Sequence, residues 1–205
     1  MKKAIIFLGG VIEDYSKLSY LDNINYHIFC ADSGAIHAMA LNLNPKFIIG
    51  DFDSIDKNTM DFFKGKTEFI DYPPEKDFTD GELLIEKIYN EYDEILVFGA
   101  LGGEYHHTLG NILLLQKYPK LILINENEEF FFLKNINTFI NKKNLTMSFI
   151  ALDKENILSL EGFKYNLNKK FISRGDTITL SNIVVEEKAL ATVIKGSFIG
   201  IIKYN

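Results

Sequence analysis

Short apolar runs alternate with segments of helical spacing along the first 125 residues of the chain. The runs have the length of buried strands, and the segments between them have the period of amphipathic helices. We expect strands at residues 3–8, 26–30, 47–49, 67–70, 95–98 and 121–124. We expect helices at residues 35–43 and 58–63, from residue 79, and at about 106–117. Strands that alternate with helices predict an α/β fold with an open parallel sheet.

The pattern changes after residue 125, where helical spacing ends. Short apolar or alternating runs follow one another, separated by Asn, Lys, Asp and Gly. We expect strands at residues 130–133, 138–140, 145–150, 157–160, 178–180, 183–185, 189–194 and 198–202. This pattern is typical of a small antiparallel all-β sandwich or barrel. The sequence therefore predicts two domains, residues 1–125 and residues 126–205.

Composition narrows the class of protein. A net charge of −6 disfavours a nucleic-acid partner, because the nucleic-acid backbone binds basic surfaces. The apolar fraction of 47% suits a protein with a core, yet no apolar run reaches the roughly 18 residues of a membrane span. The N-terminal apolar run is too short for a signal peptide. The lack of a run of membrane-spanning length argues against a membrane partner. Cys30 is the only cysteine, which excludes an intrachain disulfide and indicates a cytoplasmic protein.

Two aspartates follow the expected strand at residues 47–49. Gly50 breaks the strand, and Asp51 and Asp53 come next with one residue between them. Alternate residues of an extended chain point the same way, so both carboxylates can face one spot. Like charges held that close repel each other unless a cation lies between them, and oxygen ligands favour Mg²⁺, which usually arrives with phosphates. Taken alone, the motif fits better a polar loop whose aspartates cap a turn or a helix.

Polar or glycine-rich residues also follow three other expected strands. Ligands of open α/β sheets bind beyond the carboxyl ends of the strands, so these groups would share one edge with the aspartate pair. They are Asp32-Ser33-Gly34, Lys76-Asp77 with Thr79-Asp80, and Gly102-Gly103 with His106-His107. Gathered carboxylates indicate a metal, glycine amides at a helix start can bind an anion, and the two histidines can contact phosphate or transfer protons. The glycine pair also fits a flexible turn, and Thr79 with Glu82 also fits a plain capping box.

The chain lacks the common signatures of other nucleotide-binding and hydrolytic sites. Gly65-Lys66-Thr67 resembles part of a P-loop, but position 60 is methionine rather than glycine and the segment enters a strand. The sequence contains no Gly-x-Gly-x-x-Gly and no Gly-x-Ser-x-Gly. A dinucleotide site and a serine-hydrolase elbow are therefore disfavoured.

Taken together, the ordered motifs resemble those of thiamine pyrophosphokinase, a family that transfers a diphosphate group from ATP to thiamine. Residues 31–35, Ala-Asp-Ser-Gly-Ala, resemble the family's Ala-Asp-Gly-Gly-Ala segment with one exchange. Residues 49–55 and 75–82 match its Ile-Gly-Asp-Phe-Asp-Ser-Ile and Lys-Asp-x-Thr-Asp motifs. Residues 99–111 follow its Gly-Gly-Arg-x-Asp-His-x-Leu-x-Asn pattern, and residues 162–167 and 181–182 resemble its C-terminal motifs more loosely.

The resemblance implies an ATP-dependent diphosphotransferase with Mg²⁺ as cofactor, forming a homodimer that binds thiamine between its subunits. It implies catalytic and metal-binding roles for Asp51, Asp53, Asp77 and Asp80. The nucleotide site would comprise Asp32, Ser33, Gly34, Lys76, Thr79, Gly102, Gly103, His106, His107 and Asn111. The thiamine site would comprise Tyr165, Asn166, Ser181 and Asn182. The Tyr165 ring would replace a family tryptophan beside the cationic thiazolium.

Two positions depart from the family pattern. Glu104 stands where the family has arginine, and His106 stands where it has aspartate. A carboxylate in place of arginine reverses the charge beside a polyanion, so another cation must compensate. Lys76 is the first candidate and Arg174, the only arginine of the chain, is the second. His106 can supply a positive group or a hydrogen-bond donor that makes up part of the loss.

Other functions fit the same residues. A sister pyrophosphokinase acting on a pterin alcohol would share the site for Mg²⁺ and ATP and differ in its acceptor pocket. A thiamine or nucleotide sensor that has lost turnover would explain Glu104 and His106. A phosphatase with an Asp-x-Asp nucleophile fits less well, because such enzymes usually place that motif after the first strand.

Overall fold

The structure, a computed structural model, describes residues 1–23, 25–73, 75 and 77–204. The chain divides into two compact units. The first comprises Met1–Leu114 and Lys120–Glu126, and the second comprises Leu115–Pro119 and Asn127–Asn205. Within the described ranges, every helix is too short or too polar to span a bilayer.

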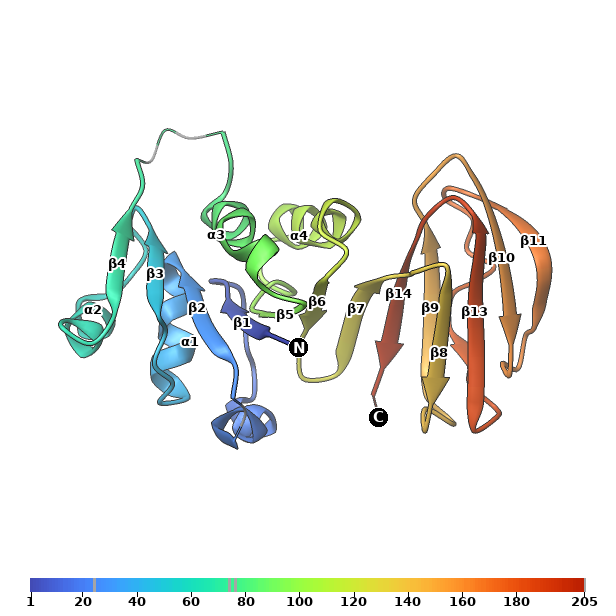
Figure 1. Ribbon diagram of the computed structural model, residues 1–205, viewed down its shortest axis with the longest axis horizontal. Helices are drawn as coiled ribbons and strands as arrows, with labels where there is room; N and C mark the ends of the chain where they lie inside the picture. The colour runs from blue at the N-terminus through green and yellow to red at the C-terminus, as the bar shows by residue number, and fades with distance from the viewer. Residues whose placement is uncertain (24, 74, 76, 205) are drawn as a thin grey trace. The chain divides into compact units, whose positions relative to one another are not determined.

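The first unit is built on a parallel sheet (Figure 1). Its strands are β1 (Lys3–Phe7), β2 (His27–Ala31), β3 (Phe47–Gly50), β4 (Glu68–Asp71), β5 (Glu94–Phe98) and β6 (Leu121–Ile124). Their order is β4-β3-β2-β1-β5-β6, and every neighbouring pair is parallel. Phe7 pairs with Cys30 of β2 and with Phe98 of β5, so these three strands end almost level. Because the chain winds outward from β1 in both directions, a topological switch point lies between β1 and β5, where α/β proteins bind ligands.

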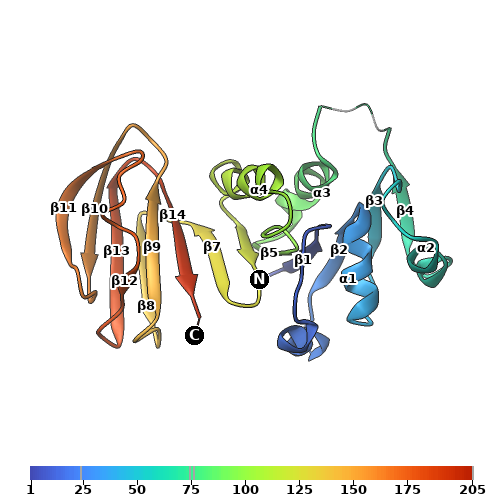
Figure 2. The ribbon, with the colours of Figure 1, turned by 180° about the vertical axis from the view of Figure 1, so that it is seen from behind.

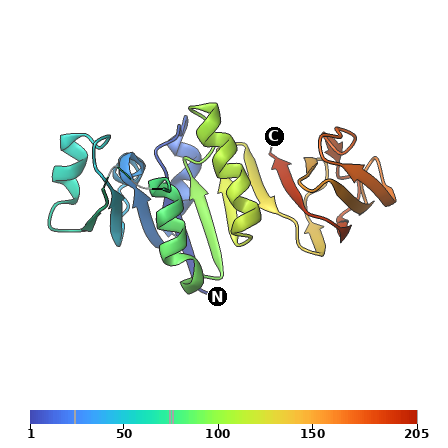
Figure 3. The same cartoon turned by 90° about the horizontal axis from the view of Figure 1, so that it is seen from above.

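Helices cover both faces of this sheet. The helix α1 (Ala35–Ala40) and the 3-10 helix η1 (Tyr15–Asn23) lie on one face, and α3 (Asp80–Ile88) and α4 (Tyr105–Lys117) lie on the other (Figures 1 and 3). The remaining helical segments are α2 (Lys57–Phe63), η2 (Asp32–Gly34) and η3 (Tyr89–Glu91). Alternation along β1 explains the covering of the first face, since Ile5 and Phe7 join one buried cluster with Ala35 and Ala38 of α1.

The second unit is a sandwich of two antiparallel sheets (Figure 2). Its strands are β7 (Glu128–Phe132), β8 (Ile136–Ile140), β9 (Thr146–Ala151), β10 (Glu155–Glu161), β11 (Leu167–Ser173), β12 (Asn182–Ile183), β13 (Lys188–Lys195) and β14 (Phe198–Lys203). Within this unit, one layer has the strand order β12-β9-β14-β7, and the other layer is a four-stranded sheet of order β11-β10-β13-β8. Phe149 and Phe198 of the first sheet share a buried cluster with Leu158 and Ala191 of the second. The fold class expected from the sequence is confirmed.

Two details of the second unit correct the sequence prediction. Residues 178–180 form turns rather than a strand, since Ile178 and Leu180 are exposed and Thr179 is the buried residue of the three. The strand β11 is not among the expected strands. It lies at a sheet edge and buries Ile172 while its lysines face solvent. An edge strand with one buried side chain shows no apolar alternation, which is why the pattern missed it.

Candidate active site

A pocket of about 400 Å³ lies at the switch point of the first unit, beyond the carboxyl ends of the parallel strands. Its walls come from segments that are far apart in the sequence. They are residues 8–11 after β1, 31–33 after β2, 79–81 at the start of α3, 99, 100 and 102–104 after β5, and His107 and Asn111 of α4. This is the edge at which the sequence predicts that the polar groups meet.

Glycines let the loops after β1 and β5 approach each other backbone to backbone. The amide of Gly10 donates a hydrogen bond to the carbonyl oxygen of Gly99, 2.9 Å away. A Cβ on Gly99 would lie 2.1 Å from the carbonyl oxygen of Leu8, and its φ of +67° also disfavours a side chain. The floor of the pocket is therefore main chain, which a ligand can approach closely. Gly9 and Gly10, which line the pocket, are not among the site residues predicted from the sequence, although a glycine pair directly after the first strand is a signal for them.

Three carboxylates gather at the ends of β2 and β3. Asp32, Asp51 and Asp53 each place one oxygen within 4.8 Å of the others. The backbone turns sharply at this point, with φ angles of 46° at Asp32 and 59° at Phe52. Gly50 allows the two loops to approach, because a Cβ there would lie 3.0 Å from the Cβ of Asp32. The predicted pair of aspartates is thus joined by a third from the neighbouring strand.

Asp32 is the most constrained member of this cluster. Its Oδ2 accepts a hydrogen bond from the Ser54 hydroxyl, whereas its Oδ1 is buried and has no hydrogen-bond partner in the described part of the chain. Burial raises the pKa of Asp32, and the charges of Asp80 and Asp51 raise it further, against the lowering effect of the Ser54 hydrogen bond. A buried carboxylate oxygen without a partner, close to two more carboxylates, fits a hard divalent cation such as Mg²⁺.

The predicted metal ligands are not all brought together. Asp51 and Asp53 belong to the cluster. Asp80, the first residue of α3, lies in the pocket wall, close enough for its charge to act on Asp32. Asp77 is exposed in the loop before α3 and is not a member of the carboxylate cluster found among the described residues. The structure therefore groups Asp32, Asp51 and Asp53, with Asp80 in the pocket wall.

The other predicted nucleotide residues of η2, and those at and before the start of α3, differ in what they contact. Ser33 and Thr79 line the pocket. Thr79 also caps α3, because its Oγ1 accepts a hydrogen bond of 3.2 Å from the amide of Glu82, as the capping motif predicts. Gly34 lies under the backbone of β1, where a Cβ would come within 2.1 Å of the Phe7 carbonyl oxygen. Lys76 falls outside the described residues.

The first turns of α4 hold the second glycine loop in place. Gly102 and Gly103 line the pocket just before this helix and have φ angles of +86° and +76°. The Thr108 hydroxyl donates a hydrogen bond of 3.1 Å to the Gly102 carbonyl oxygen. Asn111 donates one of 2.9 Å from Nδ2 to the carbonyl oxygen of Ala100. Asn111, predicted as a nucleotide residue, therefore also shapes the loop.

The two departures from the family pattern lie together at the start of α4. Glu104 and His107 line the pocket. The Nε2 atoms of His106 and His107 lie 3.2 Å and 3.9 Å from Oε2 of Glu104. Arg174, the second candidate to offset Glu104, is an exposed turn residue of the second unit.

Asn182 fixes the backbone of Tyr165 in the second unit. Its Oδ1 accepts hydrogen bonds from the amides of Tyr165 (3.0 Å) and Ile183 (2.9 Å), and its Nδ2 donates to the Tyr165 carbonyl oxygen (2.8 Å). Asn182 is buried, while the Tyr165 side chain is 60% exposed. The Nζ of Lys164 lies 5.5 Å from the centroid of the Tyr165 ring. The ring is thus presented to solvent on a fixed backbone.

The other two predicted thiamine residues shape nearby turns. Asn166 accepts a hydrogen bond of 3.0 Å at Oδ1 from the amide of Phe163. Ser181 has a φ of 54°, and its amide donates to the hydroxyl of Ser148 at 2.9 Å. Both side chains are exposed, so they are accessible to a ligand.

Two family models match the chain. Residues 18–124 match the catalytic domain of thiamin pyrophosphokinase, and residues 136–194 match the vitamin B1 binding domain of the same enzyme. The chain belongs to the thiamine pyrophosphokinase family. The thiamine pyrophosphokinase of Bacillus subtilis (strain 168) is 32% identical over 179 residues, which cover 82% of this chain and 83% of that protein.

Solved structures of thiamine pyrophosphokinases share the fold. A crystal structure of the Bacillus subtilis thiamine pyrophosphokinase has a TM-score of 0.88 at 27% identity and covers 100% of both chains. One from Geobacillus thermodenitrificans has a TM-score of 0.87 at 24% identity and covers 100% of this chain and 98% of that one. The family expected from the sequence, one of ATP-dependent diphosphotransferases, is confirmed, and these matches do not favour the pterin kinase or the sensor.

Proposed function

We propose that the chain transfers the diphosphate group of ATP to the hydroxyl of thiamine, giving thiamine diphosphate and AMP in a Mg²⁺-dependent reaction. The observation that carries this proposal is the cluster of Asp32, Asp51 and Asp53 beside a glycine-lined pocket. Carboxylate oxygens suit Mg²⁺, and glycine amides at a helix start suit phosphate. A nucleotide polyphosphate that binds together with Mg²⁺ needs both the carboxylates and the glycine amides.

The chain's own residues would hold the metal and the nucleotide. Asp51, Asp53 and Asp32 would bind Mg²⁺, with Asp80 and Asp77 as further contributors. When bound, Mg²⁺ would neutralise the charge of the polyphosphate and orient it. The amides of the glycine loop and the positive end of α4 would hold phosphate oxygens. The remaining nucleotide contacts would come from Ser33, Gly34, Lys76, Thr79, Gly102, Gly103, His106, His107 and Asn111.

The reaction needs alignment more than a strong base. The hydroxyl oxygen of thiamine attacks the β-phosphorus of ATP, the bond from that phosphorus to the α-bridging oxygen breaks, and AMP leaves. Asp53 or Asp51 would orient the hydroxyl, whose proton passes to a carboxylate or to water. Phosphoryl transfers of this kind depend mainly on positioning and charge neutralisation. The protein's task is therefore to bind and align the two substrates.

We assign ATP and Mg²⁺ binding to residues 1–125, and thiamine binding and dimerisation to residues 126–205. The exposed ring of Tyr165 suits the cationic thiazolium, since a cation above an aromatic face is attracted to it. Asn166, Ser181 and Asn182 would complete this surface. In a homodimer, the thiamine surface of one subunit would meet the nucleotide pocket of the other. The setting would be cytoplasmic, which Cys30, as the only cysteine in the sequence, supports.

Incubation of the purified protein with thiamine, ATP and Mg²⁺ tests the proposal. Chromatography should show thiamine diphosphate and AMP in equal amounts, and neither after EDTA treatment. Hydroxymethylpterin serves as the alternative acceptor in a parallel reaction. Turnover of the pterin but not of thiamine would show that the chain is a pterin pyrophosphokinase. ATP binding without AMP release would show that it is a sensor without turnover. Sedimentation velocity reports whether the protein is a dimer.

A further inference from the structure

Glu104, His106 and His107 form a second group of potential metal ligands, separate from the aspartate cluster. One ligand atom from each lies within 4.8 Å of the others. The Nε2 atoms of His106 and His107 lie 3.2 Å and 3.9 Å from the Oε2 of Glu104, and the two imidazole centroids are 4.5 Å apart. The three side chains are 59–74% exposed, so small rotamer changes can close them on an ion without disturbing the core.

The two imidazole ligands determine which cations can bind to Glu104, His106 and His107. Mg²⁺ prefers oxygen ligands and keeps several waters, so two nitrogen ligands are a poor site for it. Two histidines and one carboxylate are a ligand set that binds Zn²⁺ and related transition metals, with positions left open for water or substrate oxygen. The oxygen-only cluster of Asp32, Asp51 and Asp53 has the opposite preference. The two groups therefore select different metals.

The location of this second group affects the charge of the pocket. Glu104 and His107 line the pocket, and Glu104 follows directly on Gly102 and Gly103. A free carboxylate beside amides that suit phosphate would repel a polyanion, because like charges at short range in a partly enclosed site are unfavourable. A divalent cation held by Glu104 would reverse the local charge.

We propose that Glu104, His106 and His107 form a binding site for Zn²⁺ or a similar transition-metal ion at the mouth of the pocket. The open coordination positions of this ion would accept oxygens of an anionic ligand entering the pocket. The metal site stands on the side-chain geometry alone. Its effect on nucleotide affinity rests on the proposed function, so the two are tested by separate measurements.

The metal site is tested with tag-free protein and Zn²⁺ as the probe, in excess Mg²⁺ so that the aspartate cluster is occupied. Calorimetry should detect one Zn²⁺ per chain, and X-ray absorption at the zinc edge should show the outer-shell scattering of imidazole. His106→Gln and His107→Gln should each weaken Zn²⁺ binding by about tenfold or more, since even the loss of an indirect partner costs about that much. Asp51→Asn/Asp53→Asn is the matched control and should keep both the affinity and the imidazole signal.

Two outcomes would overturn the site. One is a Zn²⁺ affinity that is unchanged in the histidine variants, and the other is bound zinc without imidazole scattering. Either result would reduce the group to contacts between the Glu104 carboxylate and the two imidazoles. Binding of a non-hydrolysable ATP analogue, with and without Zn²⁺, then measures the effect on nucleotide. An intact zinc signal with no gain in nucleotide affinity would leave the metal site standing and reject its link to the pocket.

Discussion

His37 and Gly10 are joined by a hydrogen bond of 2.8 Å between the imidazole Nε2 and the carbonyl oxygen of the glycine. Because a carbonyl oxygen can only accept, Nε2 carries a proton. Burial lowers the pKa of His37, so the ring is neutral and its Nδ1 accepts from the Tyr15 hydroxyl, 2.7 Å away. The ring is buried and therefore has a structural role. A histidine outside the described pocket lining thus holds one of its loops.

The free energy of unfolding should fall in mild acid because of His37. Its pKa in the folded state lies below the ordinary value of 6.5, so the unfolded chain takes up the proton first as the pH falls. The contribution of neutral His37 to the free energy of unfolding is complete above pH 6.5 and is lost as the pH drops through the pKa of His37 in the folded state. Urea denaturation over a pH series should show a steeper loss for the wild type than for His37→Gln. Equal slopes would contradict a buried neutral imidazole.

A matched pair of glycine substitutions should change stability in opposite directions. Gly99→Ala should destabilise the protein by about 2 kcal/mol or more, because the new Cβ would meet the Leu8 carbonyl oxygen at 2.1 Å and the φ is +67°. Gly110 lies in α4, where an added Cβ would enter open space, so Gly110→Ala should stabilise by about 0.5–1 kcal/mol. Chemical denaturation measures both. A Gly99→Ala protein as stable as the wild type would refute the close contact of the two loops.

Asp53→Asn should lower the rate of AMP formation by about 10²-fold or more, because it removes one carboxylate that would hold Mg²⁺ or orient the thiamine hydroxyl. The side chain is exposed, so circular dichroism and the unfolding midpoint should stay near those of the wild type. Asp61→Asn is the control, since Asp61 is an exposed aspartate of α2 outside the pocket lining. Near-normal AMP release by the Asp53 variant would argue against the metal site.

Tyr165→Ala should raise the KM for thiamine about tenfold and leave the KM for ATP nearly unchanged. A contact between a cation and an aromatic face contributes about 1–2 kcal/mol, and 1.4 kcal/mol corresponds to tenfold. Tyr165→Phe keeps the ring and should behave almost like the wild type. Steady-state kinetics with each substrate varied in turn separates these cases. A large effect of the phenylalanine variant would assign the role to the hydroxyl instead.

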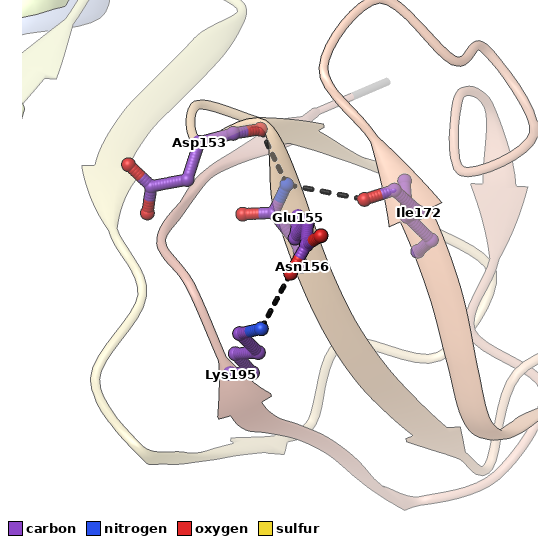
Figure 4. A network of polar contacts seen from close by, with 5 residues as sticks. All are labelled: Asp153, Glu155, Asn156, Ile172 and Lys195. Atoms are coloured by element: carbon purple, nitrogen blue, oxygen red, sulfur yellow. Dashed lines mark hydrogen bonds and ion pairs between the residues drawn. The ribbon is translucent and has the colours of Figure 1, made fainter.

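Asn156→Ala should destabilise the second unit by about 2–3 kcal/mol. The buried amide donates from Nδ2 to the carbonyl oxygens of Asp153 (2.7 Å) and Ile172 (3.1 Å), as Figure 4 shows, so its loss leaves buried acceptors without donors. In the same view Glu155 pairs with Lys195 at 2.6 Å, but both side chains are more than half exposed. Lys195→Ala should therefore cost less than about 1 kcal/mol. Similar losses of stability in Asn156→Ala and Lys195→Ala would contradict the expectation that the buried amide contributes more than the exposed ion pair.

Much of the site could be predicted because its chemistry is local. The apolar runs, the glycine after β3 and the aspartates at alternate positions are each a matter of a few neighbouring residues. Alternation with helices implies a parallel sheet, and parallel strands bring their carboxyl ends to one edge. Asp51, Asp53, Asp80 and the glycine loop before α4 could therefore be expected at one edge of the sheet without knowing the order of the strands.

The tertiary structure decided those features of the site that depend on which strands are neighbours in the sheet. The order of the strands places β2 beside β3, so Asp32 joins the aspartate pair, and places β1 beside β5, so Gly10 can bond to Gly99. The edge strand β11 was equally hidden, because its place comes from hydrogen bonds to β10 rather than from a pattern of its own. The local spacing of residues sets the face of a strand or helix on which a side chain lies. Which strands are neighbours is set by the packing of segments that are far apart in the chain.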